Sequence, residues 1–268
     1  MACRNAYRNR MIIKNAEETQ HKITEPIVVQ KVSHLFFGVD SKIQSDDLLQ
    51  NNIDMYEWVV RNKIPQNFYG RNISGENALT KEEINFLHIR GSKIVAIYSD
   101  TSGKKKEEAG VAVAKKAVES ARKLEIPVET AIFLEIANDE AVTRDFLRGF
   151  AKTLISMGYT PAFKANTDAR YSFDREFSRG MQTDKDVFKK CLIWAIAPTL
   201  AEYDGITTTH LIHPDVWRPF APSGITREQI SIWQYGKNCH SIADDEGRET
   251  TFNLNLVRNI DIIINKMF

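Results

Sequence analysis

The chain of 268 residues has few cysteines, little net charge and no long apolar segment. Its three cysteines, Cys3, Cys191 and Cys239, are widely spaced and match neither a zinc-binding nor a disulfide pattern. The net charge of +1 gives no reason to expect nucleic acid or an anionic membrane as a partner. No apolar run approaches the roughly 18 residues that a membrane span requires. The oligomeric state stays open.

Signatures of nucleotide, cofactor and metal chemistry are also missing. The sequence has no P-loop, no G-x-G-x-x-G turn, no G-x-S-x-G elbow and no H-E-x-x-H helix. His210 and His213 have a spacing that could bind a metal, but in a proline-rich region a structural role is the better interpretation. We therefore expect neither a metal nor a cofactor. The basic N-terminus lacks the apolar core of a signal peptide, so the localisation stays open.

Eight short apolar runs recur along the chain, and most of them end in a polar or charged residue. They are Leu35–Asp40, Phe68–Arg71, Ile94–Tyr98, Ile132–Glu135, Ala162–Lys164, Leu192–Ile196, His210–His213 and Ile230–Tyr235. Strand–helix repeats spaced about thirty residues apart are typical of a parallel α/β protein, and eight of them predict a closed (β/α)₈ TIM barrel. We assign the barrel to residues 33–268 and a polar N-terminal extension to residues 1–32.

Helical patterning fills most of the intervals between these runs. Thr80 and Glu83 form a capping box that begins a helix, which Gly91 can end in the left-handed conformation. Further helices are expected over 46–62, 105–124 and 140–157, with one or two short helices over 171–190. After Trp194 the connections are short and rich in proline and glycine, so we expect the last two or three βα units to be irregular.

Asp40 and Glu135 are the candidate catalytic residues, because the active site of a TIM barrel lies at the C-terminal ends of its strands. Glu135 ends an apolar strand, where desolvation raises the pKa of a carboxyl group and suits it to act as a general acid. The alternative for Glu135 is a structural ion pair with Arg71 or Lys164, and the alternative for Asp40 is a cap on the following turn. Glycoside hydrolysis commonly requires two carboxyl groups, one as general acid and one as nucleophile or base, and here they would come from separate strands.

Polar and aromatic side chains at the other strand ends are candidate substrate-binding residues. Aromatic faces stack on the apolar faces of sugar rings, and amide or charged groups bind hydroxyls, although core packing is the alternative for any single ring. Gln234 between two amphipathic rings is the most informative of these positions. The candidates are Arg71, Tyr98, Asn166, Trp194, Trp233, Gln234 and Tyr235.

Several motifs, in order, resemble a bacterial glycoside-hydrolase-like TIM-barrel domain of unknown function that is related to the glycoside hydrolase family 25 lysozymes. The motifs are Phe37-Gly38-Val39-Asp40-Ser41, Phe68-Tyr69-Gly70-Arg71-Asn72-Ile73-Ser74, Leu79-Thr80-x-x-Glu83, Ile94–Tyr98, Ala131–Glu135 and Ile232-Trp233-Gln234-Tyr235. The resemblance covers roughly residues 35 to 258. It implies that Asp40 and Glu135 line a saccharide cleft, and that the ligand is a polysaccharide or a peptidoglycan fragment of the bacterial cell wall.

The chain departs from the lysozyme pattern at two places. The lysozymes carry Asp-x-Glu on the fourth strand, whereas Ala137 stands here where the glutamate is expected. Their C-terminal Asp-x-Asn is here Asn253-Leu254-Asn255. Two hypotheses follow. In the first, the chain is a glycoside hydrolase with Glu135 as general acid and Asp40 as nucleophile, base or electrostatic stabiliser. In the second, it is a catalytically degenerate barrel that binds a glycan or a protein.

Overall fold

Eight strands close into a barrel in the order of the chain. They are β1 (Phe36–Asp40), β2 (Phe68–Asn72), β3 (Lys93–Tyr98), β4 (Ala131–Glu135), β5 (Thr160–Asn166), β6 (Leu192–Ala201), β7 (Ile232–Cys239) and β8 (Phe252–Val257). The computed structural model describes residues 35–268, except for 50–51, 101–102, 138–139, 202–216 and 240–251. The extension predicted for residues 1–32 therefore lies outside the described residues.

The strand directions confirm a closed α/β barrel and locate its irregularity. Strands β1 to β7 pair in parallel with their neighbours, whereas β8 is antiparallel to both β7 and β1. The register also shifts on both sides of β7. The predicted irregularity of the last units is thus confirmed. The sequence did not indicate a strand at Phe252–Val257, and the run predicted at His210–His213 lies outside the described residues.

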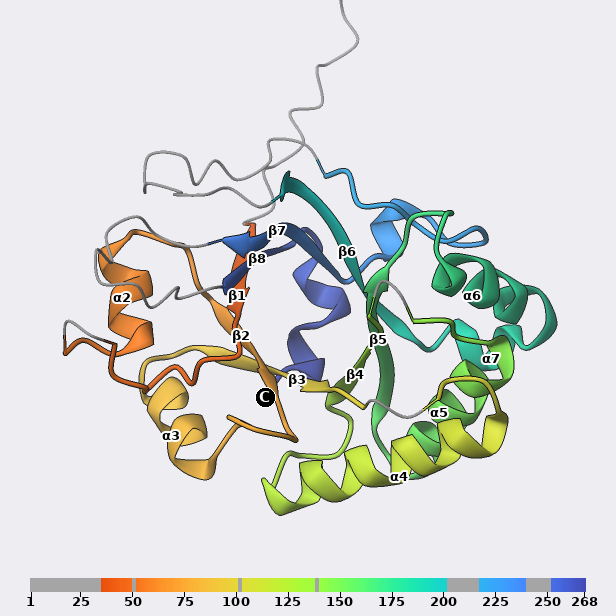
Figure 1. Ribbon diagram of the computed structural model, residues 1–268, viewed down its shortest axis with the longest axis horizontal. Helices are drawn as coiled ribbons and strands as arrows, with labels where there is room; N and C mark the ends of the chain where they lie inside the picture. The colour runs from red at the N-terminus through yellow and green to blue at the C-terminus, as the bar shows by residue number, and fades with distance from the viewer. Residues whose placement is uncertain (1–34, 50–51, 101–102, 138–139, 202–216, 240–251) are drawn as a thin grey trace, which may run out of the picture. The chain divides into compact units, whose positions relative to one another are not determined.

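Helices surround the ring of strands, as Figure 1 shows. They are α2 (Met55–Arg61), α3 (Lys81–Ile89), α4 (Glu107–Lys123), α5 (Arg144–Ser156), α6 (Ser172–Thr183) and α7 (Lys185–Phe188), with 3₁₀ helices η2 (Arg227–Gln229), η3 (Ile260–Ile262) and η4 (Ile264–Lys266). In the part of the chain that is described, no helix is long and apolar enough to span a membrane.

Two helix starts show how local sequence sets the element boundaries. Thr80 caps α3 by accepting a hydrogen bond of 3.0 Å from the backbone N–H of Glu83, as predicted, and Gly91 follows the helix with a φ of +76°. The helix expected over 46–62 is shorter, because Asp54 caps it by accepting from the N–H of Glu57 at 2.6 Å. Asp54 also forms an isolated antiparallel β-bridge with Leu48.

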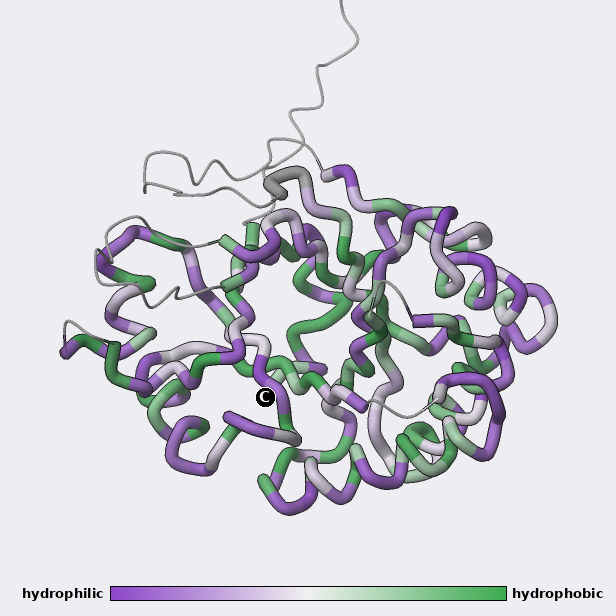
Figure 2. Tube along the Cα trace, viewed as in Figure 1, coloured by the Kyte–Doolittle hydropathy of each residue, from purple (hydrophilic) through white to green (hydrophobic). Residues whose placement is uncertain are grey.

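Side chains alternate between two cores along each strand. Those that point outward pack against the helices, as Phe163 does against Phe150 of α5. Those that point inward fill the barrel, where Phe68, Phe133 and Trp194 meet edge to face. The C-terminal segment after β8 contributes apolar side chains to this inner core at the end where the parallel strands begin. Figure 2 shows the apolar residues gathered along the strands and the polar residues toward the periphery. The opposite end of the barrel is left for polar groups.

Candidate functional site

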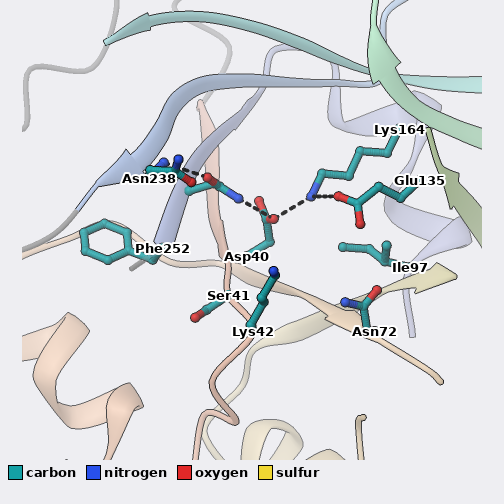
Figure 3. A pocket seen from close by; sticks show the side chains of 10 residues that line it. Asp40, Ser41, Lys42, Asn72, Ile97, Glu135, Lys164, Asn238 and Phe252 are labelled. Carbon is teal, nitrogen blue, oxygen red and sulfur yellow. Dashed lines mark hydrogen bonds and ion pairs between the residues drawn. The ribbon is translucent and has the colours of Figure 1, made fainter. Parts of the chain in front are cut away.

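A ring of inward-facing polar residues lies at the end of the barrel where the parallel strands finish. Asp40 is the last residue of β1 and Glu135 is the last residue of β4. Lys164 comes from β5, next to Glu135 in the sheet register. Figure 3 shows Lys164 reaching between the two carboxylates. The barrel therefore brings together the two candidate catalytic residues, and it places a buried cation between them.

Asp40 is only 4% exposed, and its carboxylate is fully engaged by the protein. Lys164 Nζ donates to Oδ2 at 2.6 Å, and Asn253 Nδ2 donates to the same oxygen at 2.8 Å. Asn255 Nδ2 donates to Oδ1 at 2.7 Å. Both asparagines come from β8, whose antiparallel direction brings its first residues beside the end of β1. Both oxygens of Asp40 are therefore hydrogen-bond acceptors, with three donors in all from the protein.

Glu135 is the more accessible carboxylate, with a side chain 35% exposed. Lys164 Nζ lies 3.2 Å from Oε1, and the Ser99 hydroxyl donates to Oε2 at 2.8 Å. The positive charge of Lys164 lowers the pKa of Glu135 below its ordinary value, against the opposing effect of burial. The expectation of a raised pKa is therefore wrong. The alternative prediction, an ion pair with Lys164, is confirmed.

Lys164 is the central charge of the site. Its side chain is 3% exposed, and its ammonium lies 4.7 Å from the centre of the Trp194 ring. Burial disfavours the ammonium, but the two carboxylates outweigh that effect and raise the pKa of Lys164 above its ordinary value. Since one Nζ is 2.6 Å from an Asp40 oxygen and 3.2 Å from a Glu135 oxygen, these two oxygens are at most 5.8 Å apart. An ammonium, not a water molecule, occupies the space between them.

The network extends down into the inner core through Trp194. Its indole N–H donates to Asn255 Oδ1 at 2.9 Å, which fixes the amide that binds Asp40. Gly70 of β2 makes room for this arrangement. A Cβ on Gly70 would lie 2.6 Å from the Trp194 ring and 2.8 Å from Asp40 Cβ. The fully buried Trp194 thus supports the carboxylate from below and does not face the solvent.

Two adjoining hollows of about 580 and 1420 Å³, both open to solvent, meet at this network. Lys42, Glu135, Lys164, Asn238 and Asn253 line both of them. Asp40 and Asn72 line the smaller hollow, and Ser99 and Gln234 line the larger one. Most of the lining residues carry an amide, hydroxyl or charged group, and Figure 3 shows several of them around the smaller hollow. Such a surface suits a ligand that offers many hydroxyl groups.

Four of the predicted substrate-binding residues point outward from the barrel wall. Tyr98, Trp233 and Tyr235 belong to the core between strands and helices, and each is at most 5% exposed. The indole N–H of Trp233 donates a hydrogen bond of 2.8 Å to the backbone carbonyl of Ala197. Arg71 is 1% exposed and pairs with Glu83, not with Glu135. These four side chains lie behind the wall, where core packing and a structural ion pair account for them.

The remaining predicted residues face inward. Gln234 lines the larger hollow. Asn166 ends β5 and is half-buried, and its Oδ1 accepts from the N–H of Asp168 at 3.0 Å. Lys42, Asn72 and Ser99, which line the hollows, were not indicated as site residues by the sequence, although each lies at or just after a strand end. Within the described residues, no group of three or more potential metal ligands occurs.

Comparison with known proteins assigns this barrel to a family. A family model described as the Rv2525c-like, glycoside hydrolase-like domain matches residues 56–245. The chain belongs to this family. The match contains Glu135 and Lys164, whereas Asp40 precedes it and the two asparagines of β8 follow it. Membership confirms the resemblance that the motifs indicated. A search of curated protein sequences gave no match.

Solved structures with a similar fold include an uncharacterised protein of B. stearothermophilus. The two are 22% identical with a TM-score of 0.69, and the alignment covers 87% of this chain and all of the other. A family 25 glycosyl hydrolase of Bacillus anthracis also matches, at 16% identity and a TM-score of 0.47, over 84% of this chain and 89% of its own. The lysozyme of Streptomyces coelicolor matches at 11% identity and a TM-score of 0.48, over 86% and 98%.

Proposed function

We propose that the mouth of this glycoside hydrolase-like barrel binds a glycan of the bacterial cell wall, a peptidoglycan strand in the simplest case. Two features support the proposal. The family is described as glycoside hydrolase-like, and the two hollows present carboxylate, amide, hydroxyl and ammonium groups within one continuous lining. Such groups match the dense hydroxyl pattern of a saccharide.

Binding without acid-catalysed cleavage is the function that the geometry supports best, and the Lys164 bridge is the observation that carries it. A general acid must hold a proton near the working pH, so enzymes raise the pKa of that carboxyl group. Here Lys164 acts in the opposite direction on Glu135. Asp40 accepts three hydrogen bonds from protein donors. Glu135 is therefore not prepared to give a proton to a departing sugar, and both oxygens of Asp40 already accept hydrogen bonds from protein donors.

Hydrolysis is the second candidate, because Glu135 has the properties of a nucleophile or of a stabiliser of positive charge. Its carboxylate is ionised, partly exposed and oriented by Ser99. An oxocarbenium-like transition state gains from a carboxylate in this form. The roles given by the sequence would then change: Glu135 would act as the carboxylate, and the proton would come from a group outside the network.

One variant tests both functions. Glu135→Gln keeps the size of the side chain and removes its charge, and we expect it to weaken binding of a soluble peptidoglycan tetrasaccharide about tenfold, as loss of a charged hydrogen bond does. Calorimetric titration measures the affinity, and release of reducing ends from peptidoglycan measures hydrolysis. Glu125→Gln, an exposed carboxylate in the loop before β4 at the other end of the barrel, is the control.

The outcomes separate the candidates. Binding by the native protein without release of reducing ends supports a glycan-binding barrel. Release that Glu135→Gln abolishes supports hydrolysis. Absence of both binding and release contradicts a glycan-directed function and leaves a protein partner as the ligand of the mouth.

A further inference from the structure

A buried ion pair between Arg71 and Glu83 lies directly behind the mouth. Arg71 Nε is 2.8 Å from Glu83 Oε1, and both side chains are at most 1% exposed. The terminal nitrogens of Arg71 donate to the backbone carbonyls of Ser41 at 2.6 Å and Asn77 at 2.8 Å. Glu83 Oε1 accepts from the backbone N–H of Ser45 at 2.8 Å and from its hydroxyl at 2.9 Å. One ion pair therefore holds both ends of the segment that follows β1.

This segment, residues 41–45, carries Lys42 into the mouth. Lys42 is exposed, lines both hollows and makes no ion pair with any residue in the described ranges. Figure 3 shows its side chain directed into the hollow beside Asp40. A second contact steadies the same segment, since Gln44 Nε2 donates to the carbonyl of Ala78 at 2.8 Å. The segment around Lys42 is thus held at Ser41, Gln44 and Ser45, while the Lys42 ammonium is left for a ligand.

We propose that Arg71 is a positioning residue, which with Glu83 fixes the segment 41–45 so that Lys42 contacts the bound saccharide. The inference rests on the proposed glycan-binding function. Arg71 itself touches no ligand, because it lies on the outer side of β2.

The bonding pattern of the pair explains why it is an ion pair. A buried ion pair is not needed for stability alone, because well-packed apolar residues of similar volume often stabilise a core as much as an ion pair does, or more. Apolar residues could not bind the carbonyls of Ser41 and Asn77 together with the backbone N–H and hydroxyl of Ser45. The planar guanidinium provides a fixed fork of donors that a lysine lacks. The pair therefore specifies loop geometry.

The test compares Arg71→Lys with Arg148→Lys in the full chain. Lysine keeps the charge at position 71 but cannot reach both carbonyls and the carboxylate together. Arg148 is the control, because it pairs with Glu107 at 2.6 Å between α5 and α4, and neither residue lines the hollows. We expect Arg71→Lys to weaken binding of the peptidoglycan tetrasaccharide about tenfold, as Lys42→Met does through the lost charged contact, and Arg148→Lys to change it less than about twofold.

A double-mutant cycle separates positioning from general destabilisation. If Arg71 acts through Lys42, Arg71→Lys has less than about a twofold effect on affinity in a Lys42→Met background. Full additivity of the two changes overturns the proposal.

If the native protein binds no saccharide, that result contradicts only the proposed function. Hydrogen exchange still tests whether Arg71 positions the segment 41–45. Amides of residues 41–45 exchange at least about tenfold faster in Arg71→Lys and not in Arg148→Lys. Unchanged protection in this segment overturns the inference. Ser45→Ala removes one bond to Glu83 and gives the same change, in smaller size, if Arg71→Lys fails to fold.

Discussion

Replacing Lys164 by methionine tests the bridge between the two carboxylates most directly. The variant keeps a side chain of similar length in the barrel, so it removes charge with little change of volume. Removing one partner of a buried ion pair costs about 3–5 kcal/mol, since the other charge stays buried without compensation. Asp40 would keep its two asparagine donors, and Glu135 is 35% exposed to water. We therefore expect a loss near the lower bound, about 3 kcal/mol at pH 7.

The pH dependence of this loss has a definite sign. In the native protein the folded pKa of Glu135 is lowered, chiefly by Lys164, so its stabilising contribution is present above the unfolded pKa and is lost as the pH falls through the folded value. Without Lys164, burial and the nearby carboxylate raise the pKa of Glu135, and acid then favours the folded variant. The gap in stability between the native protein and Lys164→Met therefore shrinks as the pH is lowered from 7 to about 4.

Urea denaturation followed by tryptophan fluorescence at several pH values measures this gap. Lys116→Met is the control, because the Lys116 side chain is 63% exposed and its Nζ lies 3.9 Å from Asp100, and we expect it to cost less than about 1 kcal/mol. A loss below about 1 kcal/mol for Lys164→Met, with the native pH dependence, would refute the reasoning.

Two further substitutions test the support of Asp40. Gly70→Ala places a Cβ 2.6 Å from the Trp194 ring, so we expect a loss of about 1–3 kcal/mol in urea denaturation and weaker saccharide binding, and full stability would contradict the close approach. Asn255→Leu keeps the branched shape of the side chain but removes a donor to Asp40 and an acceptor for the indole N–H, with an expected cost of about 1–3 kcal/mol, and a shift of the Trp194 indole resonance in NMR reports the lost bond.

Local patterns made most of the fold predictable. The apolar runs identified β1 to β7, and the Thr80 cap and Gly91 bounded α3, because these signals depend on a few neighbouring residues. The strand β8 was missed. Its residues alternate asparagine with leucine, and a run with polar groups on its inner face lacks the continuous apolar character of a buried parallel strand.

The sequence predicts a site residue correctly where the alternation of inward and outward side chains along the strand is taken into account. Asp40 and Glu135 both occupy inward positions, and Gln234 does as well. Tyr98 and Trp233 lie near strand ends, but each is next to an inward-pointing residue and so points at the helices. Counting back in steps of two from Asp40 along β1 and from Glu135 along β4 distinguishes the two faces without coordinates.

The sequence indicates two cations as partners of Glu135 and does not by itself distinguish Lys164 from Arg71. Lys164 was one of two cations named as a partner of Glu135, and the other, Arg71, lies on the outer face. The alternation of side chains along a strand distinguishes the two. Lys164 is two residues from Asn166 and so points into the barrel with it, whereas Arg71 is next to the inward-pointing Gly70 and so points outward. Lys164 Nζ lies 2.6 Å from Asp40 Oδ2, although the two residues are 124 positions apart in the chain. This contact depends on closure of the barrel, so local sequence does not indicate it.

The reversed direction of β8 accounts for the state of Asp40. In a parallel eighth strand the residues at the mouth would be the last of the strand, here Leu256 and Val257, which are buried and apolar. Because β8 runs antiparallel, Asn253 pairs with Asp40 in register and Asn255 follows two residues deeper on the same face. Two amides and one ammonium then satisfy the carboxylate from three sides. Asp40, held in this way, positions Lys164, whose charge in turn lowers the pKa of Glu135.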